Sequence, residues 1–265
     1  ECKPEYFFKY CVNAADENQK NDREYYQGLK NYVDSVVYPE FPYSHVYAIK
    51  EVVEKIPADS VLHLSINDSI RITNFFKLNP RIKTYANIGT HGIDGCLSSF
   101  LGQAAAGNKQ SYLVIGDLAF FYDMNAMRLR HIKNNVHILL INNEGGSEFY
   151  FNHTWKDEAS DLHTTARHHT KAEGWVKSNN FTYLSAHDKE SMQEALKEFM
   201  RSDLEKPVFL EVFTEMKTDS DVIYDFFDLS RPKDVQSETI RKSKEFIKAT
   251  IGQEKAQKIA GLFKK

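Results

Sequence analysis

The sequence has 265 residues, of which 42% are hydrophobic and 27% charged, and its formal net charge is −3. This length suits one large α/β domain or two small ones, with enough apolar residues for a packed core. The sequence shows neither a basic patch typical of nucleic-acid partners nor an apolar run near the roughly 20 residues of a membrane span. Its three cysteines lack metal-ligand spacing and leave one thiol unpaired, so we expect a reducing, cytoplasmic compartment.

Apolar periodicity divides the chain into short strands and amphipathic helices. Residues 1–40 lack a clear period and are interpreted as a connector or the tail of a preceding domain, with a helical stretch near 25–37. Helices are predicted at 43–57, 93–106, 171–178, 189–201 and 237–263. Strands are predicted at 61–66, from 83, and at 112–115, 136–141, 181–186 and 207–214. Strands alternating with helices predict a doubly wound α/β fold with a mostly parallel six-stranded sheet and helices on both faces.

The central stretch, residues 111–146, carries the first functional signal. Its two apolar runs end in Gly116-Asp117 and in Asn142-Asn143-Glu144-Gly145-Gly146. A right-handed βαβ unit leaves both strand ends at one edge of the sheet, where ligands of open α/β sheets bind. A carboxylate, an amide oxygen and a glycine carbonyl then form a set of hard oxygen donors suited to Mg²⁺ carrying a diphosphate. The alternative is that Gly, Asp and Asn stand there only because turns favour them.

The remaining chain predicts one loop and one extension. Residues 147–170 are expected to be irregular, and they contain His153, His163, His168 and His169. Imidazoles bind zinc, but no Cys, Asp or Glu spacing completes such a site here. A loop at the mouth of the crevice is therefore favoured. In such a loop one histidine could accept or donate a proton. Residues from Val222 onward are polar. We therefore predict a connector over 1–40, a ligand-binding domain over 41–221 and a helical extension over 222–265.

Three stretches together resemble one enzyme family. They are LHLSINDSIRITNFF at 62–76, YANIGTHGIDGCLSSFLG at 85–102, and GDLAFFYDMNAM at 116–127 with INNEGG at 141–146. The combination is similar to the C-terminal, diphosphate-binding domain of 2-succinyl-5-enolpyruvyl-6-hydroxy-3-cyclohexene-1-carboxylate (SEPHCHC) synthase, a thiamine-diphosphate (ThDP) enzyme of menaquinone biosynthesis. The similarity extends over roughly residues 45–215. The resemblance implies ThDP and Mg²⁺ as cofactors.

The resemblance assigns cofactor contacts to the central stretch. Asp117, Asn143 and the carbonyl of Gly145 would hold Mg²⁺. Gly116 and Leu118 would offer backbone amides near the diphosphate. This placement agrees with the metal site expected from the two strand ends alone.

Further contacts follow from the other matched motifs. Ile93 matches the bulky residue that keeps ThDP bent, and Arg71 matches an arginine that would grip a substrate carboxylate in bidentate fashion. Phe149 matches an aromatic residue of the pocket. Asn67 stands where the family has a serine beside the cofactor. Arg71 in a surface ion pair and Phe149 in the core are the alternatives.

Three departures separate the chain from the family pattern. Ile88 replaces the family's second substrate arginine, and an isoleucine cannot pair with a carboxylate. Glu148 and Asn152 stand at apolar positions of the family pocket. The cofactor site is therefore retained in the prediction, whereas the menaquinone-pathway substrates are not assumed.

The resemblance implies a domain acting on a 2-oxo acid, by decarboxylation with or without carboligation. ThDP enzymes also need a pyrimidine-binding domain that supplies a glutamate, and residues 1–40 are too short to form one. We expect this chain to be inactive alone and to assemble into a homo-oligomer. It is interpreted as a domain of a longer polypeptide, favoured by its start at Glu1, or as the β-type subunit of a two-chain decarboxylase. The third alternative is a non-catalytic binding or assembly module that keeps the fold.

Overall fold

The computed structural model describes residues 3–14, 23–89, 91–151 and 162–230. The chain divides into two units, residues 1–39 and 40–265. The first unit contains α1 (Pro4–Ala14) and α2 (Glu24–Ser35). Both helices leave large apolar side chains exposed, among them Phe8 and Tyr25. The second unit holds the sheet and every candidate site residue.

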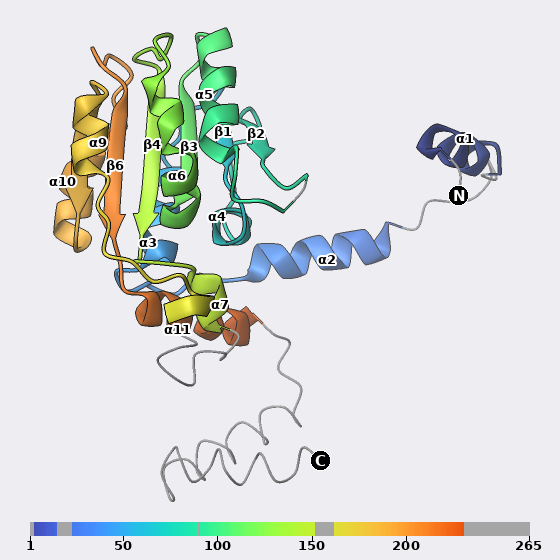
Figure 1. Ribbon diagram of the computed structural model, residues 1–265. Helices are drawn as coiled ribbons and strands as arrows, with labels where there is room; N and C mark the ends of the chain where they lie inside the picture. Colours follow the sequence, from blue (N-terminus) through green and yellow to red (C-terminus); the bar gives the residue numbers. More distant parts are fainter. Residues whose placement is uncertain (1–2, 15–22, 90, 152–161, 231–265) are drawn as a thin grey trace, which may run out of the picture. The chain divides into compact units, whose positions relative to one another are not determined.

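The sheet has six parallel strands in the order β2-β1-β3-β4-β6-β5 (Figure 1). Its strands are β1 (Val61–Leu64), β2 (Lys83–Ala86), β3 (Ser111–Gly116), β4 (Val136–Asn142), β5 (Thr182–Ala186) and β6 (Val208–Phe213). The reversal of strand order beside β1 and β3 creates the switch point at which ligands of open α/β sheets bind. The predicted doubly wound, six-stranded parallel sheet is confirmed.

Helices cover both faces of this sheet and also lie beyond its lower end (Figure 1). They are α3 (His45–Val53), α4 (Asp68–Thr73), α5 (Cys96–Ala106), α6 (Asp117–Asp123), the 3₁₀ helix η1 (Met124–Arg128), α7 (Ser147–Phe151), α9 (Glu173–Ser178), α10 (Lys189–Phe199) and α11 (Met216–Ser230). Side chains of the central strands alternate between the faces, as period-two geometry requires. Leu113 and Ile138 pack with Phe100 of α5 and Phe120 of α6.

The opposite face contains an aromatic group around one histidine. Tyr112 of β3 stacks on His137 of β4 with ring centroids 4.4 Å apart. Phe199 of α10 contacts both rings edge to face. His137 is fully buried, and its Nδ1 lies 2.7 Å from the carbonyl oxygen of Phe199. Its Nε2 lies 2.7 Å from Gln110 Oε1. A polar ring therefore fits this apolar layer because both of its nitrogens have partners.

Several predicted boundaries differ from the structure. The helix predicted over 43–57 ends at Val53, and the one predicted over 93–106 begins only at Cys96. Gly95 explains the later start, because its left-handed conformation (φ 72°) lies outside helical geometry. Within the segment predicted to be irregular, Ser147–Phe151 forms α7.

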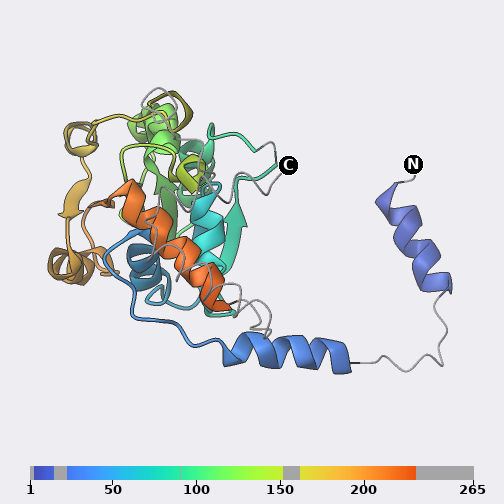
Figure 2. The same cartoon turned by 90° about the horizontal axis from the view of Figure 1, so that it is seen from below.

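Helix α11 corrects the prediction that residues from Val222 onward are polar. Val222, Ile223 and Phe226 are buried, because their i, i+1, i+4 spacing puts them on one face of the helix. Figure 1 shows α11 at the lower end of the sheet, and in the view from below α11 lies near α3 (Figure 2). The predicted boundary after residue 221 falls inside this helix. The helix predicted over 237–263 lies outside the described residues.

No helix in the described part of the chain combines the length and the apolarity that crossing a bilayer requires. Two cysteines fall within the same part, and both are free thiols: Cys11 is exposed and Cys96 is buried.

Candidate functional site

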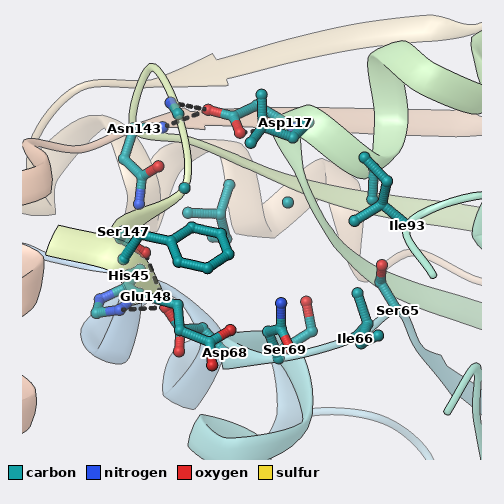
Figure 3. Close-up of a pocket in the computed structure, with 18 of the residues that line it drawn as sticks. His45, Ser65, Ile66, Asp68, Ser69, Ile93, Asp117, Asn143, Ser147 and Glu148 are labelled. Atoms are coloured by element: carbon teal, nitrogen blue, oxygen red, sulfur yellow. Dashed lines mark hydrogen bonds and ion pairs between the residues drawn. The ribbon is translucent and has the colours of Figure 1, made fainter. Parts of the chain in front are cut away.

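A pocket lies beyond the carboxyl ends of β1, β3 and β4 and is closed on its other side by α3, α4 and α7 (Figure 3). The register of β3 and β4 aligns Gly116 with Ile141, so the turns after the two strands begin side by side. Figure 3 shows Asp117 and Asn143 at one end of the pocket and His45, Asp68 and Glu148 at the other. The two ends are chemically different.

The first end is organised by the carboxylate of Asp117, which is only 2% exposed. Its Oδ2 accepts hydrogen bonds from the backbone N–H groups of Asn143 at 3.1 Å and Gly145 at 3.0 Å. Its Oδ1 accepts from the N–H of Leu118 at 2.6 Å. Convergence of the two strand ends was expected, and Asp117 and Asn143 do line the same pocket.

Two further residues hold this end in place. Asn143 donates through Nδ2 to Asp219 Oδ2 at 2.9 Å, which fixes the orientation of its amide. His168 Nε2 lies 3.3 Å from Asp117 Oδ2, and hydrogen bonding to that carboxylate raises the pKa of the imidazole above its ordinary value. Asp117 is therefore surrounded by donors, as a buried carboxylate must be.

The donor chemistry of this end fits a magnesium ion. Asp117, Asn143 and the main chain of Gly145 provide carboxylate, amide and carbonyl oxygens, the ligand types that Mg²⁺ prefers. Among the described residues, no three His, Cys, Asp or Glu side chains gather as a metal site. The zinc hypothesis for the histidines thus has no support within that part of the chain, and His153 lies outside it.

The turn after β4 requires glycine. Gly145 has φ +150°, and a Cβ at this position would lie 2.6 Å from the carbonyl oxygen of Thr165 and 2.9 Å from Met216 Cε. The N–H of Gly146 donates to the same Thr165 oxygen at 2.7 Å. The close approach of the segment near Thr165 is therefore possible only because residue 145 lacks a side chain.

We expect Gly145→Ala to lower the free energy of unfolding by about 1–3 kcal/mol, because both the conformation and the space are unfavourable for a Cβ. Urea denaturation measures the change. Gly102→Ala is the matched control, since Gly102 lies in α5 with open space around it and alanine favours helices. Equal stability of Gly145→Ala and the wild type would show that the turn does not require glycine.

A buried ionic network centred on Asp219 of α11 lies behind the other end of the pocket. Asp219 is fully buried and accepts hydrogen bonds from the backbone N–H of His45 at 2.8 Å and from Thr214 Oγ1 at 2.6 Å, besides that from Asn143. Its Oδ1 lies 3.2 Å from His45 Nδ1. Asp219 thus connects α3, α11 and the turn after β4.

His45 lies between two carboxylates. Its Nε2 is 3.9 Å from Asp68 Oδ2, on the side opposite Asp219. Burial opposes a charge on this imidazole, but Asp219 and Asp68 outweigh burial and raise the pKa of His45. Burial likewise opposes ionisation of Asp219, but His45 and the hydrogen bonds outweigh it and lower the pKa of that carboxyl. For Asp68 burial prevails, and its pKa is raised.

Two neighbouring contacts join α4 to α7 at the rim. Ser147 Oγ donates to Asp68 Oδ2 at 2.8 Å, and Arg71 Nη2 lies 2.6 Å from Glu148 Oε1. Arg71 Nη1 is also 3.6 Å from Asp68 Oδ1. Arg71 is about half exposed, with 49% of its side chain accessible, whereas Glu148 is 19% accessible.

Comparisons with curated proteins return relatives that carry the same name. No protein-family model matches the chain. Proteins named SEPHCHC synthase match it at 37% identity over 225 residues in Bacteroides fragilis, at 36% over 223 residues in Bacteroides thetaiotaomicron and at 31% over 231 residues in Flavobacterium psychrophilum. This chain is a divergent homologue of the SEPHCHC synthases. The resemblance inferred from the motifs is confirmed.

These matches cover most of the chain but a minor part of each relative. They extend over 83% of the chain for both Bacteroides proteins and 86% for the Flavobacterium protein. They extend over 40%, 40% and 42% of those synthases, respectively. The chain thus spans about two fifths of the length of these relatives.

Most residues assigned from the SEPHCHC synthase motifs gather at the pocket. Those that line it are Asn67, Ile93, Gly116, Asp117, Leu118, Asn143, Gly145 and Phe149. Arg71 is not among the lining residues and contacts the pocket through Glu148. Ile88 is 50% exposed and does not line the pocket, and Asn152 lies outside the described residues.

Sequence reasoning missed the network behind the pocket. His45 and Asp219 are 174 positions apart, and no motif links them. Asp68 falls within the motif at 62–76 but was assigned no role, although it lies at the first position of α4 and 14% of its side chain is accessible. A partial signal existed for Ser147, because it directly follows the Gly145-Gly146 turn.

Proposed function

We propose that this chain is the Mg²⁺- and diphosphate-binding part of a ThDP-dependent enzyme that acts on a 2-oxo acid, by decarboxylation with or without transfer to an acceptor. The observation that carries the proposal is the pairing of Asp117 with the Asn143–Gly145 turn in a homologue of SEPHCHC synthases. The fold alone would not suffice, since α/β sheets support many chemistries.

In this proposal Asp117, Asn143 and the carbonyl of Gly145 hold the metal ion, and the metal holds the diphosphate. When bound, ThDP supplies a carbanion-stabilising centre for cleavage beside a 2-oxo group. Ile93 lines the same pocket opposite the Asn143 turn and would keep the cofactor bent (Figure 3). The N–H of Leu118 already donates to Asp117, so it reaches a phosphate only by sharing that hydrogen bond.

The size of the pocket supports a site that is completed by another domain. Its volume is about 100 Å³. Sites that enclose whole cofactors or drug-sized ligands measure roughly 300–1,000 Å³. A pyrimidine-binding domain, from the same polypeptide or a neighbouring subunit, would cover the remainder of ThDP, and the chain alone would be inactive.

Calorimetry tests the proposal directly. Mg²⁺ and ThDP are titrated together and separately into the chain, with and without a pyrimidine-binding domain of a related synthase. We expect heat that requires both ligands and is lost in Asp117→Ala, because the variant removes the charged metal ligand. Asp203→Ala is the matched control, since Asp203 is exposed and distant in sequence from the turns. Metal-dependent heat that survives Asp117→Ala would refute the assignment.

A non-catalytic assembly module is the second candidate. It is favoured by the pairing of Arg71 with Glu148, which engages the arginine otherwise assigned to a substrate. This alternative predicts no metal-dependent ThDP heat even when the pyrimidine-binding domain is present. The same titration therefore separates the two candidates.

A further inference from the structure

Glu148 and Arg71 form an ion pair whose geometry is determined by two short helices. Ser147 and Glu148 are consecutive residues of α7, and their partners Asp68 and Arg71 are three positions apart in α4. Residues at i and i+3 lie on one face of a helix. The Ser147–Asp68 hydrogen bond therefore places Glu148 opposite Arg71, so the pair does not depend on a chance meeting of two flexible side chains.

The charges that face the pocket are unusual for a site that would bind an organic acid. The lining contains the acidic side chains Asp68, Asp117 and Glu148 and the imidazole of His45, which is buried between Asp68 and Asp219, whereas no lysine or arginine belongs to the described lining. Glu148 Oε2 is buried and lacks a hydrogen-bond partner among the described residues. The unpaired polar atom at this end of the pocket, Glu148 Oε2, is thus a hydrogen-bond acceptor.

We propose that Glu148 is a specificity-determining residue: it occupies the guanidinium of Arg71 and makes this end of the pocket select a substrate group that donates hydrogen bonds over a carboxylate. The inference rests on the proposed function, because it assumes that the pocket binds a substrate beside the cofactor. It goes further by stating the chemical class of the distal group, namely an amide, hydroxyl or ammonium group.

Competition is the physical reason for the selection. A substrate carboxylate would have to displace a carboxylate that is attached to the same chain and already in place. After displacement, Glu148 would remain beside the new anion, and like charges in a partly buried site repel. A donor group avoids both costs and satisfies Glu148 Oε2.

The first test needs no substrate. Phenylglyoxal modifies accessible guanidinium groups, and peptide mass spectrometry follows the rate at each arginine. We expect Glu148→Gln to raise the modification rate of Arg71 several-fold while the rate at Arg81, which pairs with Asp59, stays constant. Glu173→Gln, an exposed glutamate paired with Lys177, is the control variant. Equal rates at Arg71 in the wild type and Glu148→Gln would overturn the proposal.

The second test measures selectivity with succinate and succinamate, which share one carboxylate and differ at the other end. Binding is measured by calorimetry on the whole chain in the presence of Mg²⁺, ThDP and the pyrimidine-binding domain of a related synthase. We expect Glu148→Gln to increase the affinity for succinate relative to succinamate by about tenfold or more, the effect of one charge-assisted hydrogen bond. The gain should vanish in Glu148→Gln combined with Arg71→Gln. Absence of any gain in Glu148→Gln would overturn the proposal.

The two proposals fail separately. In the first case ThDP gives no metal-dependent heat, Glu148 still shields Arg71, and titrations without cofactor give the expected ligand preference. The proposed function is then refuted, whereas the preference of this pocket for hydrogen-bond donors stands. If cofactor heat depends on Asp117 but Glu148→Gln changes neither arginine reactivity nor ligand preference, the function stands and the specificity role is refuted.

Discussion

We expect Asp219→Ala to lower the free energy of unfolding by about 3–5 kcal/mol, the loss typical of breaking a buried charged pair by removing one partner. Asp219 is fully buried and accepts from the His45 backbone, Asn143 and Thr214. Its removal leaves these donors without their acceptor and leaves the His45 imidazole with only the more distant Asp68. The same change releases the amide of Asn143 at the candidate metal site.

Urea denaturation at neutral pH measures this loss. Asp221→Ala is the matched control, because Asp221 lies two residues later on α11 and 60% of its side chain is exposed. Asp221 forms an exposed ion pair with Lys217 of the same helix. Exposed ion pairs contribute about 0–1 kcal/mol, so the control should change little. A loss below about 1 kcal/mol for Asp219→Ala would mean that the network does not support the fold.

The difference in the free energy of unfolding between wild type and Asp219→Ala depends on pH. Its pH dependence follows from the directions in which the pKa values of His45 and Asp219 are shifted. The pKa of His45 is raised from 6.5, so its contribution is complete below 6.5 and is lost as pH rises through the folded value. The pKa of Asp219 is lowered from 3.8, so its contribution is present above 3.8 and is lost as pH falls through the folded value. The difference in the free energy of unfolding between wild type and Asp219→Ala should therefore be largest between pH 3.8 and pH 6.5.

The strand ends could be predicted from sequence because they depend on local patterns. Continuous apolar runs predict buried parallel strands, and the handedness of βαβ units brings their ends together. Asp117 and Asn143 follow two adjacent strands, so their meeting required no knowledge of distant contacts. The pattern at 116–127 and 141–146 then carried the family resemblance, which the comparisons confirm.

The opposite end of the pocket could not be predicted, because it depends on long-range packing. His45 belongs to a helix near the start of the second unit, and Asp219 belongs to a helix whose apolar face was overlooked. Arg71 and Glu148 meet because α7 forms where an irregular segment was expected. Periodicity shows that a helix exists, but it does not show which residue of another helix it faces.

Buried histidines illustrate the same limit. His45 and His137 are both almost fully buried, yet their environments push the pKa in opposite directions. Two carboxylates beside His45 favour its charged form. His137 lies between Tyr112 and Phe199, no carboxylate of the described residues is beside it, and burial lowers its pKa to about 4. The residue type alone therefore predicts neither charge.

This difference gives the second large effect, an acid-induced loss of stability from His137. The unfolded imidazole binds a proton below its ordinary pKa of 6.5, whereas the folded one remains neutral until about 4. Unfolding is therefore favoured as pH falls through this range, and the cost approaches about 3 kcal/mol for one histidine. In His137→Asn, which keeps a donor near the Phe199 carbonyl, this part of the pH dependence should disappear.

Urea denaturation of wild type and His137→Asn between pH 7 and pH 4 isolates the contribution, because carboxylates that titrate in the same range are common to both proteins. The variant loses the stacking on Tyr112 and starts from a lower stability, so the slope against pH carries the information. His131→Asn, at an exposed histidine before β4, should leave the slope unchanged. Parallel pH profiles for wild type and His137→Asn would show that His137 accepts a proton in the folded protein as readily as in the unfolded chain, and that the aromatic layer does not exclude its charge.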